Sequence, residues 1–110
     1  MAELKIAIAE DNPLMLELLS SILEAENGFQ VVGTADNGED AYQMIMEKEP
    51  DIVLLDVIMP KLDGITVLEK VREAKGGKNM PSIIMVTAAG NETVASAAFR
   101  NGASYYILKP

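Results

Sequence analysis

The chain has 110 residues, enough for one compact domain and too few for two of ordinary size. Its net charge of −8 argues against a domain that grips nucleic acid by itself, because phosphate contacts need clustered Lys and Arg. The sequence contains neither cysteine nor histidine, which excludes disulfides and thiol or imidazole chemistry and leaves carboxylates, hydroxyls and lysine as its reactive groups.

Five short apolar runs alternate with stretches of helical periodicity. In chain order, the runs that predict strands are residues 5–9, 29–35, 52–55, 82–86 and 104–108. Between them, the apolar residues that recur at helical spacing lie at 14–22, 41–45, 65–71 and 94–98. Pro13 suits the first turn of the first helix, Gly28 is expected to end it, and the second helix should end before Pro50.

Strands that are apolar throughout and separated by helices indicate a parallel sheet covered on both faces. Right-handed crossovers then build an α/β, doubly wound, five-stranded parallel sheet of the flavodoxin-like kind, with strand order 2-1-3-4-5. The pattern stops at Lys109-Pro110, directly after the last strand. Part of one sheet face therefore lacks a predicted helix. We interpret residues 1–110 as one domain that is truncated before its last helix, or whose open face a missing tail or a partner covers.

Polar side chains follow four of the predicted strands where each strand ends. Glu10 and Asp11 follow the first strand, Asp56 the third, Thr87 the fourth and Lys109 the fifth. Because the carboxyl ends of parallel strands meet at one edge of the sheet, these five side chains are expected to gather there. The predicted site then holds three carboxylates, one hydroxyl and one cation.

Such a set of groups suits phosphoryl chemistry. Three carboxylates at one edge repel each other, and a divalent cation relieves the repulsion; all-oxygen ligands favour Mg²⁺. A carboxylate can attack phosphorus to give an aspartyl phosphate, while Lys109 and Thr87 can neutralise and hold the phosphoryl group. Each residue also has a simpler interpretation, as a helix cap (Glu10-Asp11), a strand end (Asp56, Thr87) or a solvated lysine. Their joint occurrence at four strand ends favours the chemical one.

The stretch Asp56-Val-Ile-Met-Pro-Lys-Leu-Asp-Gly64 resembles the phosphoacceptor segment of two-component response-regulator receiver domains, which are CheY-like proteins. The acidic pair at 10–11, the Thr-Ala pair at 87–88 and the Lys-Pro ending at 109–110 match the same family in order and spacing. The resemblance covers the whole chain. Each dipeptide alone is a weak signal, whereas the four motifs together are highly specific.

The resemblance implies a role for each matched residue. Asp11 and Asp56 would bind Mg²⁺, with Glu10 assisting through water and the backbone carbonyl of Ile58 as the third protein ligand. Asp56 would accept a phosphoryl group from a phosphohistidine on a partner histidine kinase or histidine phosphotransfer protein. Lys109 would pair with the phosphoryl oxygens. Enzymatic activity would be limited to Mg²⁺-dependent self-phosphorylation from the donor and slow autodephosphorylation, without conventional turnover.

The resemblance also implies a conformational switch. Thr87 would move to hydrogen-bond the phosphoryl group, and Tyr106 would swing inward to fill the vacated space. Tyr106 also fits a half-buried aromatic residue on an edge strand. In the family the Lys109–Pro110 bond is typically cis, which would fix how Lys109 is aimed. Phosphorylation would then shift an existing equilibrium between inactive and active states.

Within the family, the stretches 56–64 and 102–110 look similar to receiver domains of sporulation-initiation response regulators. This likeness implies an output through transcription, by a DNA-binding effector domain beyond this chain, with no direct contact between this domain and nucleic acid. The family normally has a fifth helix after Lys-Pro; without it, a homodimer, in one version domain-swapped, is a further hypothesis. No apolar run is long enough to cross a bilayer and no signal peptide is visible, so a cytoplasmic location without membrane contact is expected.

Two other functions remain open on the sequence. A Mg²⁺-dependent phosphohydrolase with an aspartyl nucleophile usually places a second Asp two positions later, where this chain has Ile58. A pseudo-receiver that only binds partners would have lost an acidic, Thr or Lys position, and none is lost. Ile58 and Ala89 stand where side chains in the family tune hydrolysis; both are apolar and cannot position an attacking water, which predicts a long-lived aspartyl phosphate.

Overall fold

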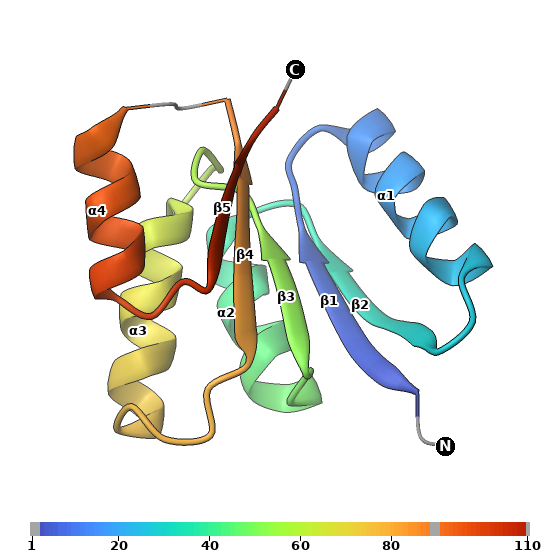
Figure 1. Ribbon diagram of the computed structural model, residues 1–110, viewed down its shortest axis with the longest axis horizontal. Coiled ribbons are helices and arrows are strands. Elements are labelled where there is room, and N and C mark those ends of the chain that lie inside the picture. The colour runs from blue at the N-terminus through green and yellow to red at the C-terminus, as the bar shows by residue number, and fades with distance from the viewer. Residues whose placement is uncertain (1–2, 89–90, 110) are drawn as a thin grey trace.

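The computed structural model describes residues 3–88 and 91–109, which fold into a five-stranded parallel sheet with strand order β2-β1-β3-β4-β5 (Figure 1). The predicted α/β fold and strand order are therefore confirmed. The strands are β1 (Leu4–Ala9), β2 (Phe29–Ala35), β3 (Ile52–Leu55), β4 (Ser82–Thr87) and β5 (Tyr105–Leu108). The helices of the described residues are α1 (Pro13–Ala25), α2 (Gly38–Lys48), α3 (Gly64–Lys75) and α4 (Glu92–Arg100).

One predicted boundary was wrong. Helix α1 ends at Ala25, three residues before Gly28, because Glu26 turns to extended backbone with φ −88° and ψ 136°. Gly28 instead serves the turn into β2, where its φ of +94° is one that glycine adopts without strain. Its carbonyl accepts the backbone N–H of Leu4 at 2.8 Å, so this turn also fixes the start of β1 beside β2.

Every described helix begins at an Asn or Asp side chain that accepts a backbone N–H of the first turn. These caps satisfy donors that have no partner within the helix, and they let the chain turn sharply after each strand. Strand ends and helix starts consequently lie close together at the carboxyl edge of the sheet. The four capping residues are Asn12, Asn37, Asp63 and Asn91.

The two faces of the sheet are covered unequally. Helix α1 lies beside β1 and β2 on one face, whereas α2, α3 and α4 lie on the other (Figure 1). The core between the sheet and these three helices is fully closed; Val53, Leu55, Ile83 and Met85 are all 0% exposed. Among the residues described, no helix has the length and apolar character needed to span a membrane.

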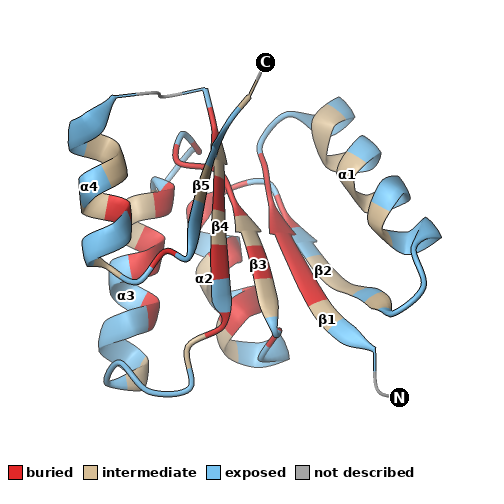
Figure 2. Ribbon diagram, in the orientation of Figure 1, coloured by how far each residue is buried: buried red, intermediate tan, exposed pale blue. Residues whose placement is uncertain are grey.

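On the face that carries α1, an apolar row runs in register across four strands, from Ile8 through Leu54 and Ile84 to Tyr105. We call it the open-face row. Ile8 is 0% exposed, Leu54 and Ile84 are partly exposed, and Tyr105 is 64% exposed. Figure 2 shows the same gradient, from the buried β1 to the exposed β5. No helix of the described residues covers β5 on this face, as the sequence predicted.

Candidate functional site

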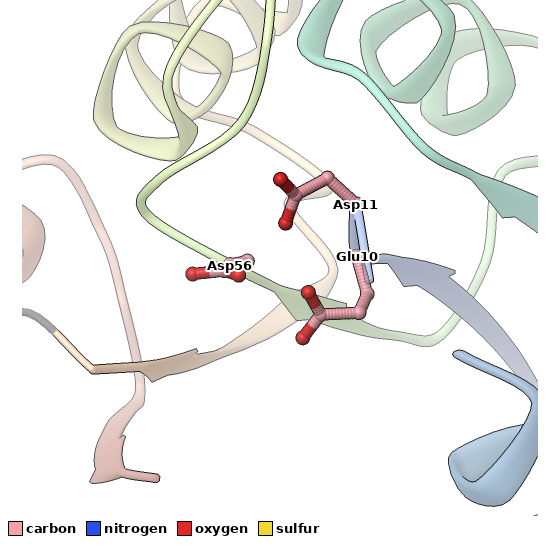
Figure 3. A group of neighbouring side chains, drawn as sticks. All are labelled: Glu10, Asp11 and Asp56. Carbon is pink, nitrogen blue, oxygen red and sulfur yellow. The ribbon is translucent and has the colours of Figure 1, made fainter. Parts of the chain in front are cut away.

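Three carboxylates meet at the carboxyl edge of the sheet, as predicted. Glu10 and Asp11 follow β1, Asp56 follows the adjacent β3, and the backbone N–H of Asp56 donates to the Ala9 carbonyl at 3.0 Å. That bond keeps the two strand ends side by side. Each of the three residues offers an oxygen within 4.8 Å of the others, and Figure 3 shows the carboxylates around one shared space. The group therefore has the composition and spacing of a site for a hard divalent cation.

Lys109 brings a cation into the same cluster. Its Nζ lies 2.5 Å from Oε1 of Glu10 and donates to Oδ2 of Asp56 at 2.8 Å. The backbone N–H of Lys109 donates to the Thr87 carbonyl at 2.8 Å, which holds the end of β5 against the end of β4. Hydrogen bonds and ion pairs thus join the ends of β1, β3, β4 and β5, the four strand ends that the sequence singled out.

The electrostatic balance of the cluster is unfavourable for three ionised carboxylates. Burial raises the pKa of Glu10, which is 2% exposed, although bonds from the Lys109 ammonium and the Asn12 N–H partly oppose the rise. Burial lowers the pKa of Lys109, but its bonds to Asp56 and Glu10 raise it by more, so the net direction is upward. Three carboxylates and one ammonium sum to a charge of −2 when all are ionised. A divalent cation would cancel that excess.

An open pocket of about 620 Å³ gives access to this cluster. Asp56 is 4% exposed at its floor, and its Oδ1 accepts the backbone N–H of Ile58 at 3.2 Å. No backbone N–H of the described residues donates to the Ile58 carbonyl, which is therefore available as a metal ligand. The pocket has room for a phosphoryl group beside Asp56. Its lining residues are Glu10, Asp11, Asn12, Pro13, Leu14, Asp56, Ile58, Ala88 and Lys109.

The two predicted switch residues lie on neighbouring strands. Thr87 is the last residue of β4, 0% exposed, and pairs in register with Leu108 of β5. Tyr106 is half-buried on β5 against the core, with its ring centroid 6.4 Å from that of Phe99. Burial raises the pKa of the Tyr106 hydroxyl. The movements assigned to both residues stay predictions.

Two predictions concern residues outside the ranges that the structure describes. One is the cis geometry of the Lys109–Pro110 bond, and the other is the contribution of Ala89 to the lifetime of a phosphorylated state. Ile58, the second position in that lifetime prediction, is described. Its side chain is 58% exposed and lines the pocket without offering any hydrogen-bonding group.

The sequence analysis gave no packing role to two glycines beside the site. A Cβ on Gly64 would lie 2.1 Å from the Asp56 carbonyl oxygen, and a Cβ on Gly38 would lie 2.0 Å from that of Leu62. Each is the first residue of a helix, directly after an Asn or Asp cap. Glycine is a poor helix former, so its occurrence after both caps was the available sequence signal for close backbone packing.

Comparison with known proteins places the whole site inside one matched region. Residues 6–110 match the family model described as response regulator receiver domain. The chain is similar to a protein in the CheX–CheY–BeF3–Mg²⁺ complex from Borrelia burgdorferi, with 32% identity and a TM-score of 0.89. The match covers 99% of this chain and 80% of the other. The receiver domain of the putative response regulator NarL from Mycobacterium tuberculosis is 28% identical over 98% and 85% of the two chains, with a TM-score of 0.90. A LuxR-family two-component response regulator from Aurantimonas is 30% identical over 98% and 75%, with a TM-score of 0.87.

Proposed function

Since this chain belongs to the response regulator receiver domain family, we propose that it is a phosphorylation-dependent signalling switch with Asp56 as the phosphoacceptor. The observation that carries the proposal is the position of Asp56. Its carboxylate lies at the floor of an open pocket, within 4.8 Å of the oxygens of two other carboxylates and 2.8 Å from the Lys109 ammonium. A nucleophile, a metal-binding group and a cation thus share one space.

The proposed reaction is a phosphoryl transfer from a phosphohistidine of a histidine kinase or histidine phosphotransfer protein. An oxygen of Asp56 forms the new P–O bond while the P–N bond of the donor breaks, and the imidazole leaves with the bonding electron pair. Lys109, which now bonds Oδ2 of Asp56, pairs with the phosphoryl oxygens as their charge builds. The hydroxyl of Thr87, at the adjacent strand end, donates to the same group.

Mg²⁺ is the proposed cofactor, and the donor set fits it. Asp11 and Asp56 would hold the ion, Glu10 would assist through water, and the Ile58 carbonyl would be the third protein ligand. When bound, the ion neutralises phosphoryl charge and offsets the repulsion among the carboxylates. The similar CheX–CheY complex contains both BeF3 and Mg²⁺, which supports this choice.

The proposed response begins at Thr87 and Tyr106. As Thr87 engages the phosphoryl group, Tyr106 moves inward from its half-buried position on β5, and the active state gains population. The output is transcription through an effector domain, in line with the LuxR-family regulator among the similar structures. The narrower sporulation-initiation role rests on the stretches 56–64 and 102–110 alone.

One experiment tests the proposal against its alternatives. The protein is incubated with Mg²⁺ and a small acyl phosphate, and its intact mass is followed over time. A single-phosphate adduct that is absent from Asp56→Asn supports the switch. Fast turnover without an adduct would instead favour a phosphohydrolase, and no reaction at all a pseudo-receiver. The adduct is expected to be long-lived because Ile58 cannot position water; a half-life of seconds at neutral pH would refute that part.

A further inference from the structure

The segment that follows β3 is clamped by the start of α2. We call residues 57–63 the phosphoacceptor loop. The backbone N–H of Gly38 donates to the Pro60 carbonyl at 3.1 Å. A Cβ on Gly38 would lie 2.0 Å from the Leu62 carbonyl oxygen and 2.4 Å from the Leu62 Cβ. Backbone atoms cannot swing away as a flexible side chain can, so only glycine allows the loop to approach α2 this closely.

The clamped part of the loop is strained. The Pro60 carbonyl also accepts the N–H of Leu62 at 2.8 Å, which closes a three-residue turn with Lys61 at its centre. Lys61 has a φ of +71°, a conformation that is rare and costly for a residue with a side chain. A strained turn of this kind persists only where its surroundings hold it in place. Gly38 supplies that hold, because its N–H bonds the same carbonyl that closes the turn.

The start of α2 is itself firmly anchored. The side chain of Asn37 is 7% exposed, and its Oδ1 accepts the N–H of Asp40 at 2.9 Å. Its Nδ2 donates to Oδ1 of Asp36 and to Oδ2 of Asp40, both at 2.9 Å. Every polar atom of this buried side chain is therefore bonded within the turn. Gly38 presents its N–H from a fixed position.

The other end of the loop is held by α3. The N–H of Gly64 donates to the Val57 carbonyl at 2.7 Å, so the carbonyls of Val57 and Pro60 are both occupied. Ile58 lies between these two held points, its N–H on Asp56 and its carbonyl without a backbone donor among the described residues. The clamps thus fix the backbone on both sides of the one carbonyl that the proposed metal site requires.

We infer that Gly38 is a positioning residue for the Mg²⁺ site. Its contacts with Pro60 and Leu62 hold the phosphoacceptor loop so that the Ile58 carbonyl and the Asp56 carboxylate stay at the spacing the ion needs. This inference rests on the proposed function, which supplies the ion and the role of Ile58. Gly38 touches neither the ion nor the phosphoryl group. It acts through Pro60 and Leu62, two and four residues beyond Ile58.

The test compares Gly38→Ala with Gly76→Ala in the unphosphorylated protein. Gly76 ends α3 with a φ of +64° and has nothing within 4 Å of an added Cβ, so its replacement strains the backbone far from the loop. Mg²⁺ affinity is measured by isothermal titration calorimetry and stability by urea unfolding. We expect Gly38→Ala to bind Mg²⁺ about tenfold more weakly, as substitutions behind metal ligands do, and Gly76→Ala to bind like the wild type. Phosphorylation of Gly38→Ala should recover when Mg²⁺ is raised.

Equal Mg²⁺ affinity in Gly38→Ala, Gly76→Ala and the wild type would overturn the inference while leaving the switch intact. A wild-type protein that neither binds Mg²⁺ nor takes up phosphate would instead overturn the proposed function, so the two failures are distinguishable. If Gly38→Ala does not fold, Asn37→Ala and Asn37→Ser take its place. The alanine variant loses the cap and should weaken Mg²⁺ binding, and serine, which keeps a capping oxygen, should restore it. Identical affinities in those two variants and the wild type would again overturn the inference.

Discussion

The two faces of the sheet differ in how tightly they are packed, and the strands that carry the candidate site residues differ in the same way. On the face covered by α2, α3 and α4, the core is closed, and the loop that follows Asp56 is bonded to the starts of α2 and α3. Tyr106 packs against the same core but lies on β5, an edge strand whose Tyr105, Ile107 and Leu108 are all more than half exposed, and Lys109 directly follows that strand. The loop beside the proposed phosphoacceptor is bonded to two helices, whereas β5, which carries the proposed switch residue Tyr106, is an edge strand with three exposed residues.

A signalling switch has a physical reason to combine a tightly packed region with a loosely packed one. The chemistry proposed for Asp56 requires fixed distances, which tight packing provides. A response requires an element with two arrangements of similar free energy, and such elements come from regions with few buried contacts. An edge strand with one uncovered face meets that requirement.

The largest expected effect tests the packing contrast directly. Leu68→Ala should lower the free energy of unfolding by about 2–5 kcal/mol, because this leucine of α3 is 0% exposed in the closed core. Leu18→Ala changes a leucine of α1 that is 54% exposed, and should cost less than about 1 kcal/mol. Urea unfolding of both variants gives the comparison. Equal losses would show that the two faces are packed alike.

A second prediction separates chemistry from response at Lys109. Lys109→Ala removes the cation 2.8 Å from Asp56, so phosphorylation should slow but remain detectable as a mass adduct, because the proposed nucleophile and metal ligands are intact. The response to phosphorylation should be lost, seen as unchanged oligomeric state and unchanged amide shifts along β5. Lys78→Ala, at an exposed lysine, is the control. A full response in Lys109→Ala would contradict the role assigned to this residue.

The smallest expected effect distinguishes two neighbouring tyrosines of β5. Tyr106→Ala should be phosphorylated at nearly the wild-type rate yet transmit less of the change to α4, since Tyr106 packs against the core and Phe99. Tyr105→Ala removes a side chain that is 64% exposed on the opposite face and should leave both steps unchanged. Amide chemical shifts of α4, before and after phosphorylation, measure the difference. Identical behaviour of the two variants would remove Tyr106 from the proposed switch.

Local pattern and a general rule of topology were enough to predict the fold and the meeting of the candidate site residues at one edge of the sheet. Apolar runs separated by helical periods determine a parallel sheet, and the carboxyl ends of its strands must share one edge, so Glu10, Asp56 and Lys109 could be brought together without coordinates. The end of α1 was missed because glycine fits a helix end and a tight turn equally well, and Gly28 serves the turn.

The features that could not be predicted depend on contacts between segments distant in sequence. The approach of Gly38 to Leu62 and the positive φ of Lys61 arise only once α2 and the phosphoacceptor loop are packed together. The pairing of Lys109 with Glu10 as well as Asp56 likewise depends on side-chain directions at the strand ends. Periodicity marked Leu18 as apolar and helical, but it does not tell which apolar residues of a helix are covered.

The open-face row also bears on the colloidal behaviour of the protein. Its exposed end lies on β5, which is an edge strand of the sheet, and an apolar edge strand is a template for self-association. A net charge of −8 opposes such association, because molecules that approach one another repel. That repulsion is screened over about 8 Å at physiological ionic strength. Added salt should therefore lower the solubility of this domain, because it weakens the repulsion that opposes association through β5.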